Sequence, residues 1–452
     1  MFCLNKTFQR ILTRTDLDRF LFYGQKMRRL STWDTQVGII SLIDCSVFRM
    51  LSITLDQFYP NRVVMRQLRE FSFQFIQHGS LWEVIPYLSA SLQTINMEIM
   101  TGIHSLPAMT FLSAVALKSP FIKDITIDGS SSDRSNTTPI SSSFPCGFRH
   151  LSTFDCDFPI HYNTIGHLAH LPNLRDVSLH FSGTNANHAS LPAMPAQPFP
   201  SLRHLLLIGT HFTSAIEFIQ TFLPSVSLQS IKVIAENPPS AGELYQFFSA
   251  LSSRICLSAL TSVLLDYDPG EEYRAGPVLE SSDFEPLLRF NNLEYLQLNA
   301  AFSPEHISDS LLEAMSFAWP QLTNFGLYST LFPRPLPQCT FDGLLHFAKW
   351  CPRLASLDML FTASSKIDWN DRSRVVPVNR NLKYLTVGTS PIGDIGMVVS
   401  LLSDVFPNIA QITVWDDDDH VGDGFGENYQ RWQEVINQYM EKRPSRTEVG
   451  SL

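Results

Sequence analysis

The chain has 452 residues, of which 44% are hydrophobic and 17% are charged, and its net charge is −10. This composition supplies apolar surface for a large core and excludes a chain that is disordered throughout. The acidic balance argues against nucleic acid and anionic membranes as partners, since sequence-independent binding of either needs a basic stripe.

The cysteines and the first residues indicate where the protein works. The seven cysteines never stand as C-x-x-C, and residues 1–24 lack the cationic and apolar pattern of a secretory signal. The longest apolar runs are too short to span a bilayer. We therefore expect free thiols in a cytoplasmic or nuclear protein that does not enter a membrane.

One six-residue pattern recurs along the chain: an apolar residue, two free positions, a second apolar residue, one free position and usually a third apolar residue. The pattern starts fourteen times, at Met27, Leu68, Leu92, Ile122, Phe148, Leu174, Leu202, Leu228, Leu260, Leu293, Leu322, Leu354, Leu382 and Ile409. The first interval is 41 residues and the later ones are 24 to 33 residues, which is close to the period of leucine-rich repeats.

Each hexad predicts a strand and each interval predicts a helix. In the hexad of Leu293, the apolar residues Leu296 and Leu298 are two apart, which places them on one face of a strand with Gln297 on the other. Apolar residues spaced by three and four predict short amphipathic helices over 341–351 and 392–406. Prolines close most of these helices two residues before the next hexad, namely Pro172, Pro200, Pro320, Pro352 and Pro407.

The predicted fold class is therefore an α/β leucine-rich-repeat solenoid, curved, with parallel strands inside and helices outside. We assign residues 1–26 to an N-terminal helical cap or remnant and residues 27–428 to the solenoid. A helix over 429–441, with Trp432, Val435 and Tyr439 on one side, closes the C-terminal end before a frayed tail. Insertions at 129–147, 185–200, 267–282 and 364–380 are expected to be edge loops, and the serine-rich one is open to a regulatory role.

The motifs that could carry chemistry have simpler interpretations. The acidic run at 416–419, followed by glycines, lacks the glutamate that a calcium loop needs and would repel a phosphate. His161, His167 and His170 lack the further ligands of a zinc site and are interpreted as surface histidines. We predict no catalytic residue, metal or cofactor. An enzyme of the parallel β-helix type remains a third alternative, disfavoured by the helix in every unit.

The inner face of the strands is the predicted binding surface. Polar and aromatic residues there suit contact with a protein, because tyrosine and tryptophan contribute much of the energy at interfaces. In or beside the strands we select Glu70, Asp124, His150, Asp176, His204, Tyr295, Gln297, Asn324, Asp358 and Tyr384, and just beyond the strands His180, Asp266, Tyr328 and Trp415.

The segment from Leu344 to Met359, a helix that ends in cysteine and proline before a strand, resembles the repeat of F-box/leucine-rich-repeat proteins. The irregular spacing, the serine-rich loops and the opening segment Leu17–Leu30 resemble the F-box-associated members of that family in mushroom-type fungi. The resemblance implies the substrate-receptor subunit of a cullin-type (SCF-like) ubiquitin ligase, whose F-box helices dock on a Skp-type adaptor while the solenoid presents a target.

The residues before Met27 depart from the family pattern. They contain neither the Leu-Pro opening of an F-box nor room for its three helices. We expect a Skp-type adaptor to bind only if an F-box lies upstream of this chain, and we transfer no adaptor-binding residue. Two functions stay open: target recognition connected with ubiquitin ligation, and an adaptor-independent protein-interaction scaffold.

Overall fold

A computed structural model describes most of the repeats. It covers residues 4–6, 10–31, 41–43, 45–60, 63–75, 84–99, 105–129, 147–181, 195–224, 226–237, 239–240, 242–267, 280–300, 304–329, 336–363, 376–415 and 425–442. The predicted insertions, the acidic run at 416–419 and the C-terminal tail therefore lie wholly or largely outside the described residues. Contacts divide the chain into two compact units: unit 1 is Met1–Gly209 with Phe222–Val226, and unit 2 is Thr210–Thr221 with Ser227–Leu452.

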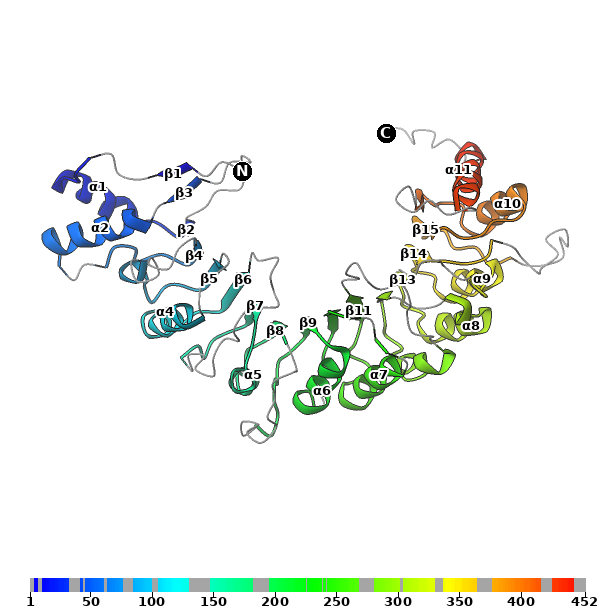
Figure 1. Cartoon of the computed structure of the whole chain (residues 1–452), viewed down its shortest axis with the longest axis horizontal. Helices are drawn as coiled ribbons and strands as arrows, with labels where there is room; N and C mark the ends of the chain where they lie inside the picture. Colours follow the sequence, from blue (N-terminus) through cyan, green and yellow to red (C-terminus); the bar gives the residue numbers. More distant parts are fainter. Residues whose placement is uncertain are drawn as a thin grey trace, which may run out of the picture. The chain divides into compact units, whose positions relative to one another are not determined.

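Unit 1 contains parallel strands that pair in chain order (Figure 1). These are β2 (Arg29–Ser31), β4 (Glu70–Phe75), β5 (Thr94–Ile99), β6 (Asp124–Gly129), β7 (Thr153–Pro159), β8 (Asp176–His180) and β9 (His204–Thr210). A separate parallel pair joins β1 (Leu4–Lys6) to β3 (Ser41–Ile43). The helices are α1 (Arg14–Gly24), α2 (Cys45–Phe58), η1 (Ile85–Tyr87), α4 (Ser105–Lys118) and α5 (Tyr162–Ala169).

Unit 2 repeats the same order of elements. Its strands are β10 (Ser230–Ala235), β11 (Ser262–Tyr267), β12 (Tyr295–Ala300), β13 (Asn324–Ser329), β14 (Ser356–Met359), β15 (Tyr384–Gly388) and β16 (Gln411–Val414), again parallel and in chain order. Its helices are α6 (Phe212–Phe222), α7 (Glu243–Arg254), η5 (Ser281–Phe284), η6 (Leu287–Arg289), η7 (Pro304–His306), α8 (Asp309–Ala318), α9 (Phe341–Trp350), α10 (Ile395–Val405) and α11 (Phe425–Lys442).

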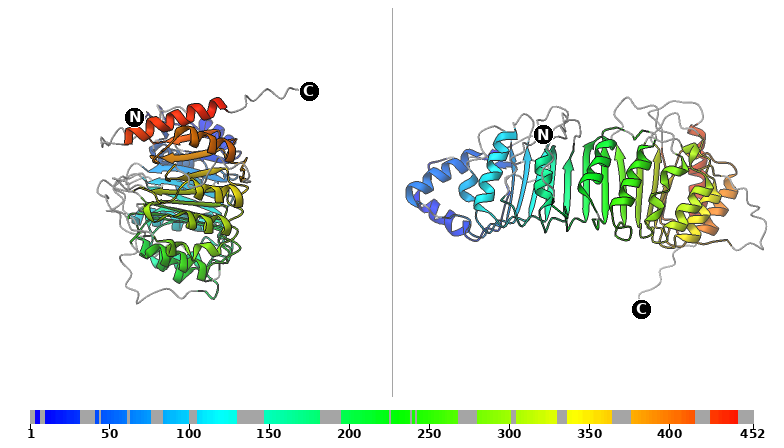
Figure 2. Two further views of the ribbon diagram at one scale, coloured as in Figure 1. Left: turned by 90° about the vertical axis from the view of Figure 1, so that its right-hand side faces the viewer. Right: turned by 90° about the horizontal axis from the view of Figure 1, so that it is seen from below.

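The apolar residues of the hexads form the core. Leu293, Leu296 and Leu298 are all buried, and the strand register places Leu296 beside Phe325 of the next coil. Figures 1 and 2 show the helices α7, α8 and α9 on one side of the strands of unit 2. We call the opposite side of each ladder, to which the residues between the apolar positions point, the open face. The chain is thus an α/β solenoid of the leucine-rich-repeat type.

The backbone joins each coil to the next in the same way. The carbonyl of Thr261 accepts hydrogen bonds from the N–H groups of Glu294 (2.8 Å) and Tyr295 (3.0 Å), and the carbonyl of Glu294 accepts from those of Thr323 and Asn324. These bonds involve backbone groups, so any residue type except proline can donate them. The repeat therefore constrains the buried positions and leaves the open face free to vary.

One predicted hexad is displaced by three residues. Strand β7 begins at Thr153, which pairs with Asp124 on one side and Asp176 on the other. The hexad that forms the strand starts at Leu151 and not at Phe148, and its third apolar residue is the buried Cys156. The predicted placement of His150 in a strand is therefore wrong: the residue is exposed and precedes β7.

The C-terminal helix covers the end of unit 2. Helix α11 begins four residues before the predicted 429–441, and Trp432, Val435 and Tyr439 are buried. The indole Nε1–H of Trp432 donates to the carbonyl of Ser390 (2.8 Å). The hydroxyl of Tyr439 donates to the carbonyl of Phe406 (2.6 Å) and accepts from the N–H of Ile409 (3.1 Å).

Among the described helices, none is long and apolar enough to cross a membrane.

Replacing Trp432 by alanine should destabilise the end of unit 2, because it empties a buried site and leaves the carbonyl of Ser390 without its donor. We expect a loss of about 3–5 kcal/mol in the free energy of unfolding, measured by urea denaturation. Tyr439→Phe should cost about 1–3 kcal/mol, since it removes a hydroxyl that serves two buried backbone groups. Amide exchange in β15 and β16 that is unchanged in both variants would contradict a capping role for α11.

Candidate functional site

The strand register arranges the side chains of the open face in rows. In unit 2 the first row consists of the residues just before the second apolar residue of each hexad: Ser230, Ser262, Tyr295, Asn324, Ser356, Tyr384 and Gln411. The second row consists of the residues between the second and third apolar positions: Lys232, Leu264, Gln297, Gly326, Asp358, Thr386 and Thr413. Hydroxyl, amide and aromatic groups fill the first row, and the second row is mixed.

Five residues selected from the sequence meet on four consecutive strands of unit 2. We name this area the two-tyrosine site and define it by Tyr295, Asn324, Ser356 and Tyr384 of the first row and Gln297, Gly326, Asp358 and Thr386 of the second row. Tyr384 is 54% exposed, while Tyr295 is partly buried. The two tyrosines stand on β12 and β15, and small polar residues occupy the first-row positions between them.

Hydrogen bonds order one side of this site. The hydroxyl of Tyr295 donates to Oε1 of Gln297, and Nε2 of Gln297 donates to Oδ1 of Asn299 (3.1 Å). Gly326 follows Gln297 in the second row and contributes no side chain there. A Cβ built on it would lie 3.3 Å from Cγ of Gln297 and 3.8 Å from Cβ of Asp358, so the row is interrupted between these two residues.

Asp358 is the carboxylate of the two-tyrosine site. Partial burial raises the pKa of Asp358 to about 7, since desolvation disfavours the charged form. The pKa of Tyr295 is also raised, first by burial and then by the negative charge of Asp358. Among the described residues, no lysine, arginine or histidine forms an ion pair with Asp358.

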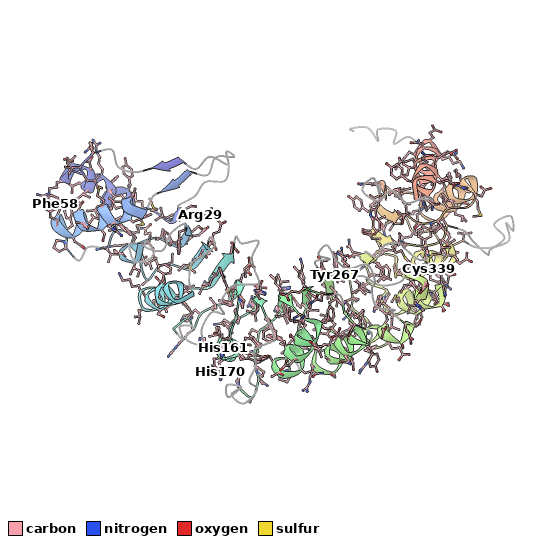
Figure 3. The ribbon with its side chains drawn as sticks, in the orientation of Figure 1. Arg29, Phe58, His161, His170, Tyr267 and Cys339 are labelled. Atoms are coloured by element: carbon pink, nitrogen blue, oxygen red, sulfur yellow. The ribbon has the colours of Figure 1, made fainter. Side chains whose placement is uncertain are left out.

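Four of the predicted site residues of unit 1, namely Glu70, Asp124, Asp176 and His204, fall in its first row, and each has a partner in the protein. Figure 3 labels Arg29, whose Nε lies 2.7 Å from Oε2 of Glu70. Oδ1 of Asp176 lies 3.9 Å from Nε2 of His204. Asp124 accepts hydrogen bonds from the hydroxyls of Thr94 (3.1 Å) and Ser152 (3.0 Å).

An acidic group on the open face of unit 1 was not among the residues selected from the sequence. Glu98, Asp128, Asp155 and Asp157 lie on the adjacent strands β5, β6 and β7. Burial, followed by the charges of the other three carboxylates, raises the pKa of Asp128 to about 6. The displaced hexad hid Asp155 and Asp157, because they become open-face residues only when the strand begins at Thr153.

The residues predicted beyond the strands mostly lie within them. His180, Asp266 and Tyr328 belong to β8, β11 and β13, because these strands extend past the third apolar residue. The side chain of Tyr328 lies outside the described part of the structure. Trp415 does follow β16, and its backbone N–H donates to the backbone carbonyl of Gly388 (3.3 Å).

His180 is not the exposed contact residue that the sequence suggested. Only 3% of it is exposed, and it packs against Gly209 of the next strand. A Cβ on Gly209 would lie 2.2 Å from Nε2 of the imidazole, and the backbone φ of +59° is one that glycine adopts readily. A glycine here therefore makes room for His180 inside unit 1.

The three neighbouring histidines belong to helix α5 or to its two ends. Figure 3 labels His161 and His170, which are the N-cap and C-cap of this helix. Nδ1 of His161 accepts from the N–H of Asn163 (3.2 Å), and Nδ1 of His170 lies 2.7 Å from the carbonyl oxygen of Gly166. Burial and the nearby His170 lower the pKa of His167. Within the described ranges, no group of three histidine, cysteine or acidic side chains is arranged to hold a metal ion.

Comparison with known proteins assigns the chain to no family. No protein-family model matches the chain, and no curated protein matches it either. Among solved structures, a chain in the crystal structure of the Rad7 and Elc1 complex in yeast is similar, with 17% sequence identity and a TM-score of 0.35. That match covers 70% of this chain and 79% of the other. At this level of similarity the match carries no argument about function.

The raised pKa of Asp358 predicts how stability changes with pH. The folded-state pKa of about 7 exceeds the ordinary value of 3.8. Ionisation of the carboxyl therefore lowers the free energy of unfolding, and this loss grows as the pH rises from about 4 to about 7. Asp358→Asn should remove this cost. We expect it to be more stable than the wild-type protein by about 1–2 kcal/mol at pH 8, discounted for partial solvation, and equal to it near pH 4. Urea unfolding of both proteins at each pH measures the difference, and a constant difference would contradict the prediction.

Proposed function

We propose that the chain is a protein-recognition solenoid that binds another protein on the open face and carries out no chemistry. The observation that supports this most directly is the two-tyrosine site, where aromatic, amide and hydroxyl groups lie on one sheet face in four adjacent strands. Parallel strands about 4.8 Å apart present these groups as a broad surface, which suits a macromolecule. Tyrosine offers a large contact area together with a hydroxyl that can pair with a polar group of the partner.

Three buried cysteines of the described part lack the reactivity of a catalytic thiol, whereas the fourth free cysteine, Cys256, is exposed and its pKa is lowered by a hydrogen bond with Ser258. Burial raises the pKa of the thiols of Cys156, Cys339 and Cys351, so these thiols stay protonated and are poor nucleophiles. Each is within hydrogen-bonding distance of a backbone carbonyl, as Sγ of Cys339 is of Leu360 (3.2 Å). They act as small core residues between coils.

We further propose that this solenoid is the target-recognition component of a cullin-type ubiquitin ligase. The support is the resemblance of the unit Leu344–Met359 to F-box/leucine-rich-repeat proteins, and the structure forms helix α9, the Cys351–Pro352 stop and strand β14 from that unit. The open face would hold the target while the ligase transfers ubiquitin to it. The alternative is an interaction scaffold that needs no adaptor.

Affinity capture from the native cell tests recognition by the open face. The Tyr295→Ala, Tyr384→Ala double variant should lose the specifically captured protein, with a fall in affinity of about 30-fold or more, because each substitution removes aromatic contact area. Tyr245→Ala is the matched control, since Tyr245 is 43% exposed but lies on helix α7. If the wild-type protein, the double variant and Tyr245→Ala all capture the same amount of partner, recognition at this site is overturned.

A pull-down with a purified Skp-type adaptor separates the two forms of the proposal. Stable binding of the adaptor supports the ubiquitin-ligase role. If this chain fails to bind the adaptor yet still captures its target, the scaffold is favoured. The capture experiment provides the positive control, because it shows that the same preparation is folded and competent.

A further inference from the structure

We propose that the two-tyrosine site receives an arginine side chain of the partner protein, with Asp358 as its counter-ion. This inference rests on the proposed function, since it names the chemistry that the open face recognises. It is carried by three features of the site: a carboxylate that pairs with no cation among the described residues, a missing side chain beside it, and tyrosines on both sides. Each feature follows from the strand register.

The first feature is the charge. Asp358 is the one charged residue among the described first-row and second-row positions from β11 to β16. The nearest cation in these rows, Lys232, stands on β10, four strands away in the sheet order. Lys383 precedes Tyr384, but its ammonium donates to the carbonyl of Arg380 (3.4 Å). The described part of unit 2 therefore leaves Asp358 without a cation.

Partial burial makes this arrangement favourable for a partner's cation. A carboxylate that has lost part of its hydration gains more from an opposite charge than a fully solvated one does, because the local dielectric is lower. The protein holds Asp358 in this condition at a cost to its own stability. A cation brought by the partner offsets that cost on binding.

The second feature is the space beside the carboxylate. Gly326 precedes Asp358 in the second row and carries no side chain, and Ser356 on the same strand as Asp358 is small. On the side of β13 a planar group that approaches Asp358 meets no side chain of Gly326 itself, and the nearest side chain there is Gln297, whose Cγ lies 3.3 Å from where a Cβ of Gly326 would stand. Asn324 of the first row lies on that strand and adds a side-chain oxygen, which already accepts a bond from the hydroxyl of Thr323 (2.9 Å) and has a second lone pair.

The third feature is the pair of aromatic residues. Tyr295 and Tyr384 stand on either side of Asn324 and Ser356 in the first row. Arginine suits this setting better than lysine, because its guanidinium is planar, stacks on aromatic rings, pairs with a carboxylate through two N–H groups and is more weakly hydrated. The geometry thus favours a guanidinium over a compact ammonium.

A random-peptide display library, selected on the full chain, provides the probe. Peptides selected by the wild-type protein should share an arginine at one position, and selection on Asp358→Asn should lose that preference. Asp404→Asn is the control, since Asp404 is an exposed carboxylate on helix α10, away from the open face. It should select the same arginine-containing peptides as the wild-type protein. Thermal unfolding of both variants verifies that each is folded.

The best peptide is then synthesised with arginine, lysine or citrulline at the shared position. On the wild-type protein, citrulline should weaken binding about 10- to 100-fold, the size expected for loss of a charge-assisted pair, and lysine should fall between the two. On Asp358→Asn the arginine and citrulline peptides should bind equally. This loss of difference ties the arginine to Asp358 itself.

The outcomes separate this inference from the proposed function. Selected peptides without a shared arginine, or a citrulline penalty that persists in Asp358→Asn, would overturn the inference and leave protein recognition intact. A preference for lysine over arginine would overturn the guanidinium assignment. If the wild-type protein selects no peptide and also captures no protein from the native cell, the proposed function fails together with the inference.

Discussion

The structure depends on the burial of apolar residues at fixed positions in each coil. One coil has a strand and a helix and cannot cover its own apolar side, so its stability comes from the coils stacked on it. The residues Leu293, Leu296 and Leu298, for example, lose nearly all contact with water because Phe325 and its neighbours lie in the next coil. At about 25 cal/mol for each Å² removed from water, each such leucine contributes about 1.5–3 kcal/mol.

This constraint also separates stability from recognition. Side chains alternate across a strand, so burying the second and third apolar residues of a hexad turns the residues around them to the open face. Backbone bonds such as those to the carbonyl of Thr261 hold the coils in register whatever these residues are. The open face can therefore carry four neighbouring carboxylates in unit 1 and an Asp358 with uncharged neighbours in unit 2 without changing the fold. These two compositions suit different partner chemistry.

The arrangement of strands could be predicted because the apolar spacing is a local signal. Thirteen of the fourteen predicted hexads coincide with the strands in register. The exception has a local cause, since Phe148, Leu151 and Phe154 are spaced by three and allow two starts. The pairing of Thr153 with Asp124 and the burial of Cys156 decide between them. The same alternation places Tyr295, Asp358 and Tyr384 on the open face of unit 2, while their part in binding stays a prediction.

Properties that arise between coils could not be predicted in this way. Tyr295 and Asp358 are far apart in sequence, and the influence of one on the other's pKa exists only because β12, β13 and β14 pair in order. The burial of His180 depends on Gly209 in the following coil. The acidic group that includes Asp128 requires three strands in the correct register. Each case needs a distance between coils, which apolar spacing does not provide.

Hydroxyl-radical footprinting of the tyrosine side chains, with and without the captured partner, tests recognition by the open face most directly. It compares two exposed tyrosines of the same unit, Tyr384 on strand β15 and Tyr245 on helix α7. If the open face binds the partner, the partner protects Tyr384 from oxidation while Tyr245 reacts as before. Protection of Tyr245 with no change at Tyr384 would place the partner on the helices and contradict the account.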